Sequence, residues 1–146
     1  MTRFGAVAAL ACLAVTGCGG GGGRLSKEDY AKQADAICSK YNRKIEALGA
    51  PKSLADIAGY ADKALALTRK GNDELEHLKP PKSEEQTAKE WVAQNDLVAN
   101  AVADLRDAAK KNDRLAIRAA LRRGQAANRT ANGLAGDLGL QVCARG

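Results

Sequence analysis

The chain has few of the side chains on which most catalytic sites depend. Its 146 residues include one His, one Met, one Phe and one Trp, and aromatic residues make up 3% of it. A serine or cysteine hydrolase needs His as its base, and no Ser-centred motif surrounds the single His77. We therefore expect no enzyme activity and no catalytic residues.

The same scarcity argues against cofactors and metals. Glu74 and His77 form one Glu-x-x-His pair, but di-iron bundles need two such pairs and further carboxylates. No Cys-x-x-Cys-His motif for haem is present, and the glycine run at Gly19–Gly23 lacks the Lys of a phosphate-binding loop. We expect no cofactor and no metal site.

Long hydrophobic runs are also missing. The apolar stretch from Phe4 to Val15 is too short to span a bilayer comfortably, but with Arg3 before it and small residues after it, it has the parts of a secretory signal. The following Val15-Thr16-Gly17-Cys18 resembles the lipobox, in which the Cys thiol takes a lipid. We predict a signal peptide at 1–17, lipidation of Cys18 and an extracytoplasmic protein anchored to the cell membrane. An ordinary signal peptide with a chance Cys is the alternative.

The predicted mature chain begins with a spacer at 18–24. Glycine loses the most backbone freedom on ordering, so Gly19–Gly23 is expected to be a flexible tether. Together with Arg24 it spans roughly 13 Å on average and about 20 Å when stretched. The folded part at 25–146 is therefore expected to stay close to the membrane.

Residues 25–146 have helical periodicity and no strand pattern. Four segments each start at a capping residue and stop at Gly, Pro or a polar cluster. The expected N-caps are Ser26, Ser53, Ser83 and Asp113, and Gly139 with Leu140 resembles a glycine-terminated helix end. Apolar residues recur at steps of three and four, which predicts one inward stripe per helix. These stripes are Tyr30, Ala34, Ile37, Tyr41, Ile45 and Leu48; Leu54, Ile57, Ala61, Leu65, Thr68, Asn72 and Leu75; Trp91, Val98, Val102 and Leu105; and Ile117, Leu121, Gly124, Ala131, Leu134 and Leu138.

Four helices of similar length joined by short connections favour an all-α fold, an antiparallel up-down four-helix bundle. Small residues at facing positions, such as Ala34, Ala61, Gly124 and Ala131, predict closely approaching helices. Such packing leaves little room for a bound group.

The four cysteines divide between these parts. Cys12 leaves with the signal and Cys18 is lipidated, so Cys38 and Cys143 remain as a pair in an oxidising compartment. We expect a disulfide, because the bundle topology returns the end of the fourth helix to the start of the first. A two-thiolate metal site is the alternative, although zinc needs further Cys or His ligands.

Several of these segments together resemble small helical lipoproteins of actinobacteria. The resemblance rests on the lipobox-like sequence, the glycine run, Leu25–Tyr30 with Ala34–Cys38, and the terminal Leu138–Cys143. It implies export, lipidation and the pairing of Cys38 with Cys143. It supplies no catalytic residues.

The net charge is +6, and one helix concentrates basic residues on one side. Arg114, Arg118, Arg122 and Arg129 fall at helical spacing, which predicts attraction to lipid headgroups or acidic wall polymers. The alternative is a solvated face partly balanced by Asp104 and Asp107. Nucleic acid is not expected as a partner, because no base-stacking aromatic lies beside the arginines.

The sequence thus favours a non-enzymatic binding or structural module of the cell envelope. It would hold the membrane through the lipid on Cys18 and bind an envelope protein or an anionic polymer. A carrier of a small ligand or metal inside the bundle is the alternative.

Overall fold

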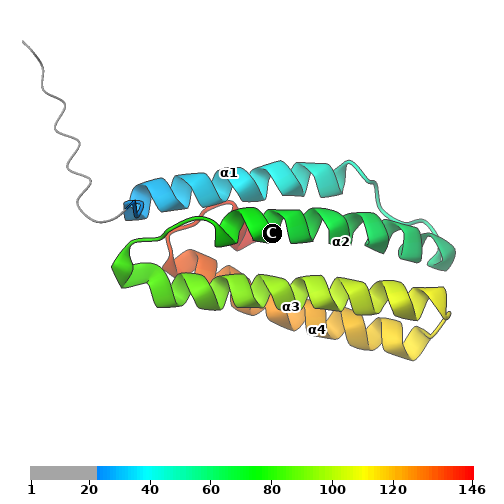
Figure 1. The fold of residues 1–146 in the computed structure, drawn as a ribbon. Coiled ribbons are helices and arrows are strands. Elements are labelled where there is room, and N and C mark those ends of the chain that lie inside the picture. The colour runs from blue at the N-terminus through cyan, green and yellow to red at the C-terminus, as the bar shows by residue number, and fades with distance from the viewer. Residues whose placement is uncertain (1–22) are drawn as a thin grey trace, which may run out of the picture.

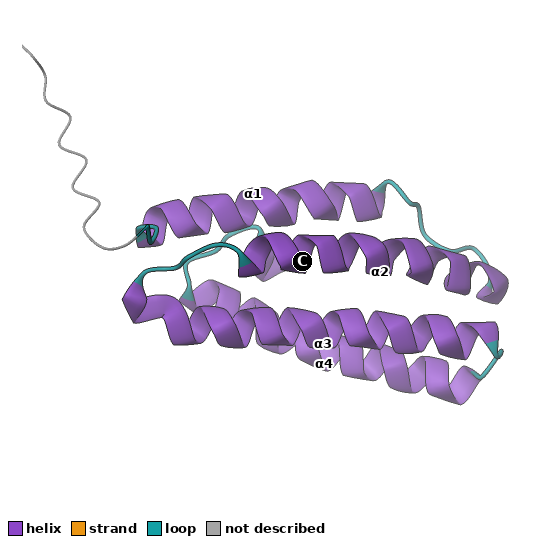
Figure 2. Cartoon of the chain, in the orientation of Figure 1, coloured by secondary structure: helices purple, strands orange, loops and turns teal. Residues whose placement is uncertain are grey.

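The computed structural model describes residues 23–146, so the predicted signal segment at 1–17 and the predicted lipidation site at Cys18 lie outside the described residues. Helices account for the regular structure of residues 23–146, and no strand occurs there (Figure 2). The elements are α1 (Lys27–Glu46), α2 (Leu54–Glu76), the 3₁₀ helix η1 (Lys82–Glu84), α3 (Glu85–Lys110), α4 (Arg114–Asp137) and the 3₁₀ helix η2 (Cys143–Arg145).

The helices run up and down in an antiparallel bundle, as expected (Figure 1). The most extensive contacts join α3 with α4 and α2 with α3, while α1 packs on α2. The segment containing η2 packs on both α4 and α1. All four α-helices of the described chain therefore pack into one bundle, and the C-terminal segment packs between α1 and α4.

Four helix ends meet at one end of the bundle, which we call the tether end because the predicted tether leads into it (Figure 1). The start of α1, the end of α2, the start of α3 and the end of α4 lie there. The Leu25 amide donates to Lys79 O at 2.9 Å, and Lys27 Nζ lies 2.9 Å from Glu84 Oε1 and 3.4 Å from Asp137 O. These contacts fix the entry of the chain into the bundle.

Three of the expected N-caps are confirmed. The Ser26 and Ser53 hydroxyls accept from the amides of Asp29 and Asp56 at 3.0 and 3.3 Å. Asp113 Oδ1 accepts from the amides of Leu115 and Ala116 in the first turn of α4, at 3.1 and 2.9 Å. Each cap satisfies amides that have no partner within the helix.

The expected glycine-terminated end of α4 is also confirmed. Gly139 has φ +79°, a left-handed conformation that an L side chain rarely adopts. Its amide donates to Gly136 O, and the Leu140 amide donates to Ala135 O, both at 2.9 Å. This is the hydrogen-bond pattern of a Schellman motif, and it turns the chain toward α1.

The prediction that Ser83 caps the third helix is wrong. Ser83 lies inside η1, and α3 begins two residues later without a side-chain cap. Pro81 is held in an extended conformation and the Glu84 amide donates to Pro81 O at 3.0 Å, so the chain enters through a tighter turn. Gln86, three residues after Ser83, donates to Glu90 within α3.

Alanine fills most of the core. Buried alanines come from every α-helix, and the large side chains that are almost fully buried are Tyr30, Trp91, Leu138 and Leu140. Gly124 lets α4 approach α3, because a Cβ there would lie 3.3 Å from Ala101 Cβ. The expected close approach is therefore confirmed. Leu121, expected to face inward, is instead 46% exposed, since the neighbouring Ala120 occupies the inward position.

The buried residues form two hydrophobic clusters, and the two clusters differ in the helices that contribute to them. At the tether end, Tyr30, Leu75, Trp91 and Leu138 pack together with residues from all four α-helices of the described chain. At the other end the cluster around Ile117 draws on α2, α3 and α4 but not on α1. Every buried residue lies between Tyr30 and Cys143, so a chain beginning at Gly23 carries the whole described core.

Within residues 23–146, no helix combines the length and the apolar character needed to cross a membrane.

Candidate functional site

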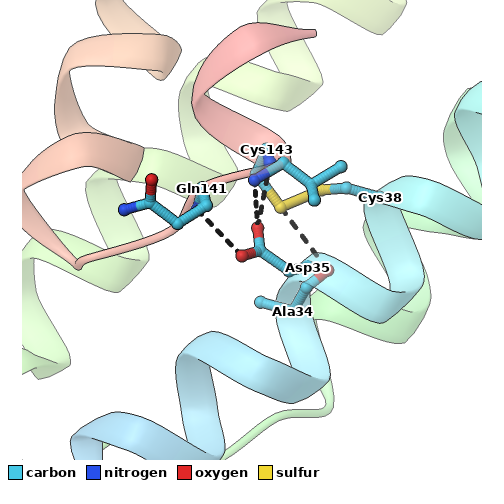
Figure 3. The surroundings of a disulfide bond; sticks show 6 residues. Ala34, Asp35, Cys38, Gln141 and Cys143 are labelled. Carbon is cyan, nitrogen blue, oxygen red and sulfur yellow. Dashed lines mark hydrogen bonds between the residues drawn. A yellow bond between two sulfur atoms is a disulfide. The ribbon is translucent and has the colours of Figure 1, made fainter.

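The structure joins Cys38 on α1 to Cys143 at the start of η2 by a disulfide, as expected (Figure 3). Their Cα atoms lie 5.4 Å apart, and 105 residues separate them in the sequence. Cys143 is buried, and its Sγ lies 3.4 Å from Ala34 O. The bond therefore ties the C-terminal segment to the middle of α1.

Asp35 holds the same segment through hydrogen bonds (Figure 3). Its Oδ2 accepts from the Gln141 amide at 2.8 Å, and its Oδ1 accepts from the amides of Val142 and Cys143 at 2.8 and 3.0 Å. We call Asp35, Cys38 and Cys143 the tail staple. No motif marks Asp35 for this role, but it precedes Cys38 by three residues and so lies on the same side of α1.

The Glu74 carboxylate forms hydrogen bonds with side chains of α1 and not with His77. Lys40 Nζ lies 2.6 and 2.8 Å from its two carboxylate oxygens, and the Tyr41 hydroxyl donates to Oε1 at 2.7 Å. The hydrogen bond from Lys40, followed by the one from Tyr41, lowers the pKa of Glu74 below its ordinary value. The bond to Glu74 in turn raises the pKa of Lys40 and of Tyr41.

His77 is the exposed C-cap residue of α2, and its Nδ1 lies 2.6 Å from Asp73 O. The predicted Glu-x-x-His pair thus consists of one residue bound to α1 and one capping residue. Residues 23–146 contain no group of three or more His, Cys, Asp or Glu side chains that could hold a metal ion.

The arginine face, which consists of Arg114, Arg118, Arg122 and Arg129, lies on the outside of α4. All four side chains are exposed, and none forms an ion pair with any residue of the described chain. Of the acids expected to balance this face, Asp104 pairs with Arg123 at 2.7 Å and Asp107 with Arg106 at 2.7 Å. Neither neutralises the arginine face.

Asparagine side chains from every α-helix of the described chain border a cavity of about 180 Å³ beneath the disulfide. Asn72 is buried and donates to Asp96 Oδ1 at 2.9 Å. Asn128 and Asn132 both donate to Gly146 O, at 2.9 and 3.2 Å. Asn42 and Asn95 complete the set. Of these five asparagines only Asn72 falls on an apolar stripe of the sequence, so the helical periodicity does not predict that they converge.

A second cavity, of about 480 Å³, lies at the tether end. Its apolar wall includes Tyr30, Leu75 and Val92, and Arg24 and Lys89 stand at its rim. Burial raises the pKa of Tyr30 to about 12. Glu85 bridges the rim, since it lies 2.9 Å from Arg24 and 3.0 Å from Lys89.

Comparison of the chain with known protein families, with curated proteins and with solved structures finds no match.

Proposed function

We propose that this protein is an exported lipoprotein, anchored to the cell membrane through Cys18, that acts as a non-enzymatic binding or structural module of the cell envelope. The observation that carries the proposal is the way the cysteines are used. Cys38 and Cys143 are paired in a disulfide, a bond that persists in oxidising compartments outside the cytoplasm. That pairing leaves Cys12, which lies in the predicted signal, and Cys18, whose lipobox-like sequence suits it for lipidation.

The described structure supports the non-enzymatic part of this proposal. Alanine packing brings the helices close together, and His77 lies exposed at the end of α2 with its Nδ1 against a backbone oxygen. A general base that activates a side-chain nucleophile lies within hydrogen-bond reach of it, and the hydrogen-bond partner of His77 within residues 23–146 is Asp73 O instead. The exposed arginine face offers a binding surface instead.

Replacement of Cys18 tests the anchor directly. Cys18→Ala should abolish the incorporation of radiolabelled palmitate in the producing cell, because the thiol that accepts the lipid is gone. Cys12→Ala is the matched control, since it removes a cysteine from the predicted signal and should leave the labelling intact. Undiminished labelling of the Cys18→Ala protein would contradict the proposal.

The asparagine-lined cavity favours a second candidate function, the carriage of a small uncharged polar ligand. Amide groups both donate and accept hydrogen bonds, which suits a hydroxyl-rich molecule. At about 180 Å³ the cavity is smaller than the several hundred Å³ of most ligand pockets, so we rank this function second. Native mass spectrometry of protein purified from the envelope would reveal a retained ligand, and a spectrum with the bare mass alone would contradict carriage.

A further inference from the structure

Two exposed leucines flank the arginine face of α4. Leu115 is 78% exposed and Leu121 is 46% exposed. At 3.6 residues per turn, the four arginines and both leucines fall within an arc of about 120° around the helix axis. One side of α4 therefore combines concentrated positive charge with two exposed apolar side chains.

The stability of α4 does not account for this arrangement. No Asp or Glu occurs between Arg114 and Gly136, and Arg114 stands in the first turn, where the helix dipole disfavours positive charge. Leu115, which is 78% exposed, adds little burial to the core, and Leu121 leaves 46% of its surface in solvent. A partner that is both negatively charged and apolar would make use of both kinds of side chain.

We propose that this side of α4 docks on an anionic phospholipid bilayer. The arginines contact lipid phosphates, and Leu115 and Leu121 enter the boundary between headgroups and acyl chains, as in helices that lie in the membrane interface. A soluble polyanion such as an acidic wall polymer would satisfy the arginines but would leave both leucines in water. The leucines therefore favour the bilayer.

The geometry of the bundle fits this docking, which rests on the proposed membrane anchor. Lys27 Nζ lies 3.4 Å from Asp137 O, so the start of α1 adjoins the end of α4. When α4 lies flat on a bilayer, the start of α1 is close to the surface. Its distance from the surface is within the roughly 20 Å that the six residues from Gly19 to Arg24 can span. The lipid on Cys18 and the face of α4 then hold the same membrane, and the bundle lies along it.

Vesicle binding by a chain that begins at Gly23, and so lacks Cys18, tests the docking. The vesicles contain equal amounts of phosphatidylglycerol and phosphatidylcholine, or phosphatidylcholine alone. Arg118→Glu with Arg122→Glu should weaken binding to the anionic vesicles by at least about tenfold, since each basic residue near an anionic surface contributes severalfold in affinity. Leu115→Ser with Leu121→Ser should weaken it by about tenfold, because the apolar contact is lost.

Matched variants on other faces serve as controls. Lys63→Glu with Lys70→Glu makes the same charge change at two exposed α2 residues that form no ion pair in the described chain. Leu97→Ser removes a leucine of α3 that is 50% exposed. Both controls should bind the anionic vesicles more tightly than the corresponding α4 variants, and thermal melting checks that every variant is folded.

Two results would overturn the proposal. The first is equal binding of the α4 variants and their controls. The second is loss of binding on arginine reversal with no effect of the leucine variants, together with tight binding to soluble polyphosphate, which would assign the face to a polyanion. Because the chain that begins at Gly23 lacks Cys18, its binding to vesicles does not depend on lipidation. A failure of palmitate labelling and a failure of vesicle binding are therefore distinguishable.

Discussion

The carboxylate of Glu74 joins α2 to α1 through the side chains of Lys40 and Tyr41. Gly71 makes room for this contact, because a Cβ at that position would lie 3.2 Å from the Tyr41 ring. From the sequence, Gly71 is only a residue that weakens a helix. Its role depends on the side chain of another helix, which the spacing of apolar residues does not reveal.

Glu74→Gln should lower the melting temperature at neutral pH, and the difference should depend on pH. The pKa of Glu74 is lowered on folding, so its contribution is present above its ordinary pKa of 4.5 and is lost as the pH falls through the folded value. The pKa values of Lys40 and Tyr41 are raised, so their contributions are lost only as the pH rises above about 10. Melting curves from acidic to alkaline pH should show a difference in melting temperature between the wild type and Glu74→Gln from about pH 5 to about pH 10. This difference should disappear in acid.

Glu76→Gln is the control for this experiment. Glu76 is exposed near the same end of α2 and forms no ion pair or side-chain hydrogen bond within residues 23–146. Its replacement removes a charge near the same helix end without removing a partner. If the loss of melting temperature in Glu74→Gln stayed constant with pH, or if Glu76→Gln showed the same loss, the stabilising role of the Glu74 carboxylate would be contradicted.

At the scale of the element, local capping signals predicted three helix starts and missed one. Ser26, Ser53 and Asp113 each place an oxygen near amides within the next three residues, and that geometry depends only on neighbours in the sequence. Before α3, Pro80 and Pro81 impose an extended entry, and Glu84 and Glu85 are drawn to Lys27 and Arg24 of the tether end. These tertiary ion pairs are not visible in a local pattern.

Alanine substitutions at the caps measure this difference. Asp113→Ala should reduce the free energy of unfolding by about 1 kcal/mol, because two amides of α4 lose their acceptor. Ser83→Ala should change it by no more than a few tenths of a kcal/mol, since Ser83 accepts no capping hydrogen bond. Urea denaturation compares the two variants. An equal loss for Ser83→Ala would mean that Ser83 caps α3 after all.

Across the whole molecule, the sequence was sufficient to predict the bundle and the disulfide but not how the ends of the bundle differ. Helix count, direction and the meeting of Cys38 with Cys143 follow from periodicity and topology. The absence of α1 from the cluster around Ile117 does not, because it depends on how far α1 reaches along its neighbours. The outward position of Leu121 likewise depends on the exact rotation of α4, because the adjacent apolar residues Ala120 and Leu121 could each be the one that faces the core.

The tail staple holds the C-terminal segment against the cluster that contains the large buried side chains. Tyr30, Trp91, Leu138 and Leu140 belong to the same cluster as Cys143. The short C-terminal segment covers this cluster and has only η2 as regular structure. Its position therefore depends on the disulfide and on the three amides bound by Asp35.

Cys38→Ser should destabilise the whole molecule, and reductant should have the same effect on the wild type but none on the variant. The bond closes a loop of 105 residues, and restriction of the unfolded chain over a loop of that order is worth up to about 4.7 kcal/mol. That is a large part of the 5–15 kcal/mol typical of a folded domain. Urea denaturation of the chain from Gly23, with and without reductant, measures the loss.

Asp35→Ala is the comparison, because it frees three amides while keeping the bond, and its unfolding should remain sensitive to reductant. Two free thiols per chain in denatured, unreduced protein from the cell envelope would contradict the pairing and with it the large loss.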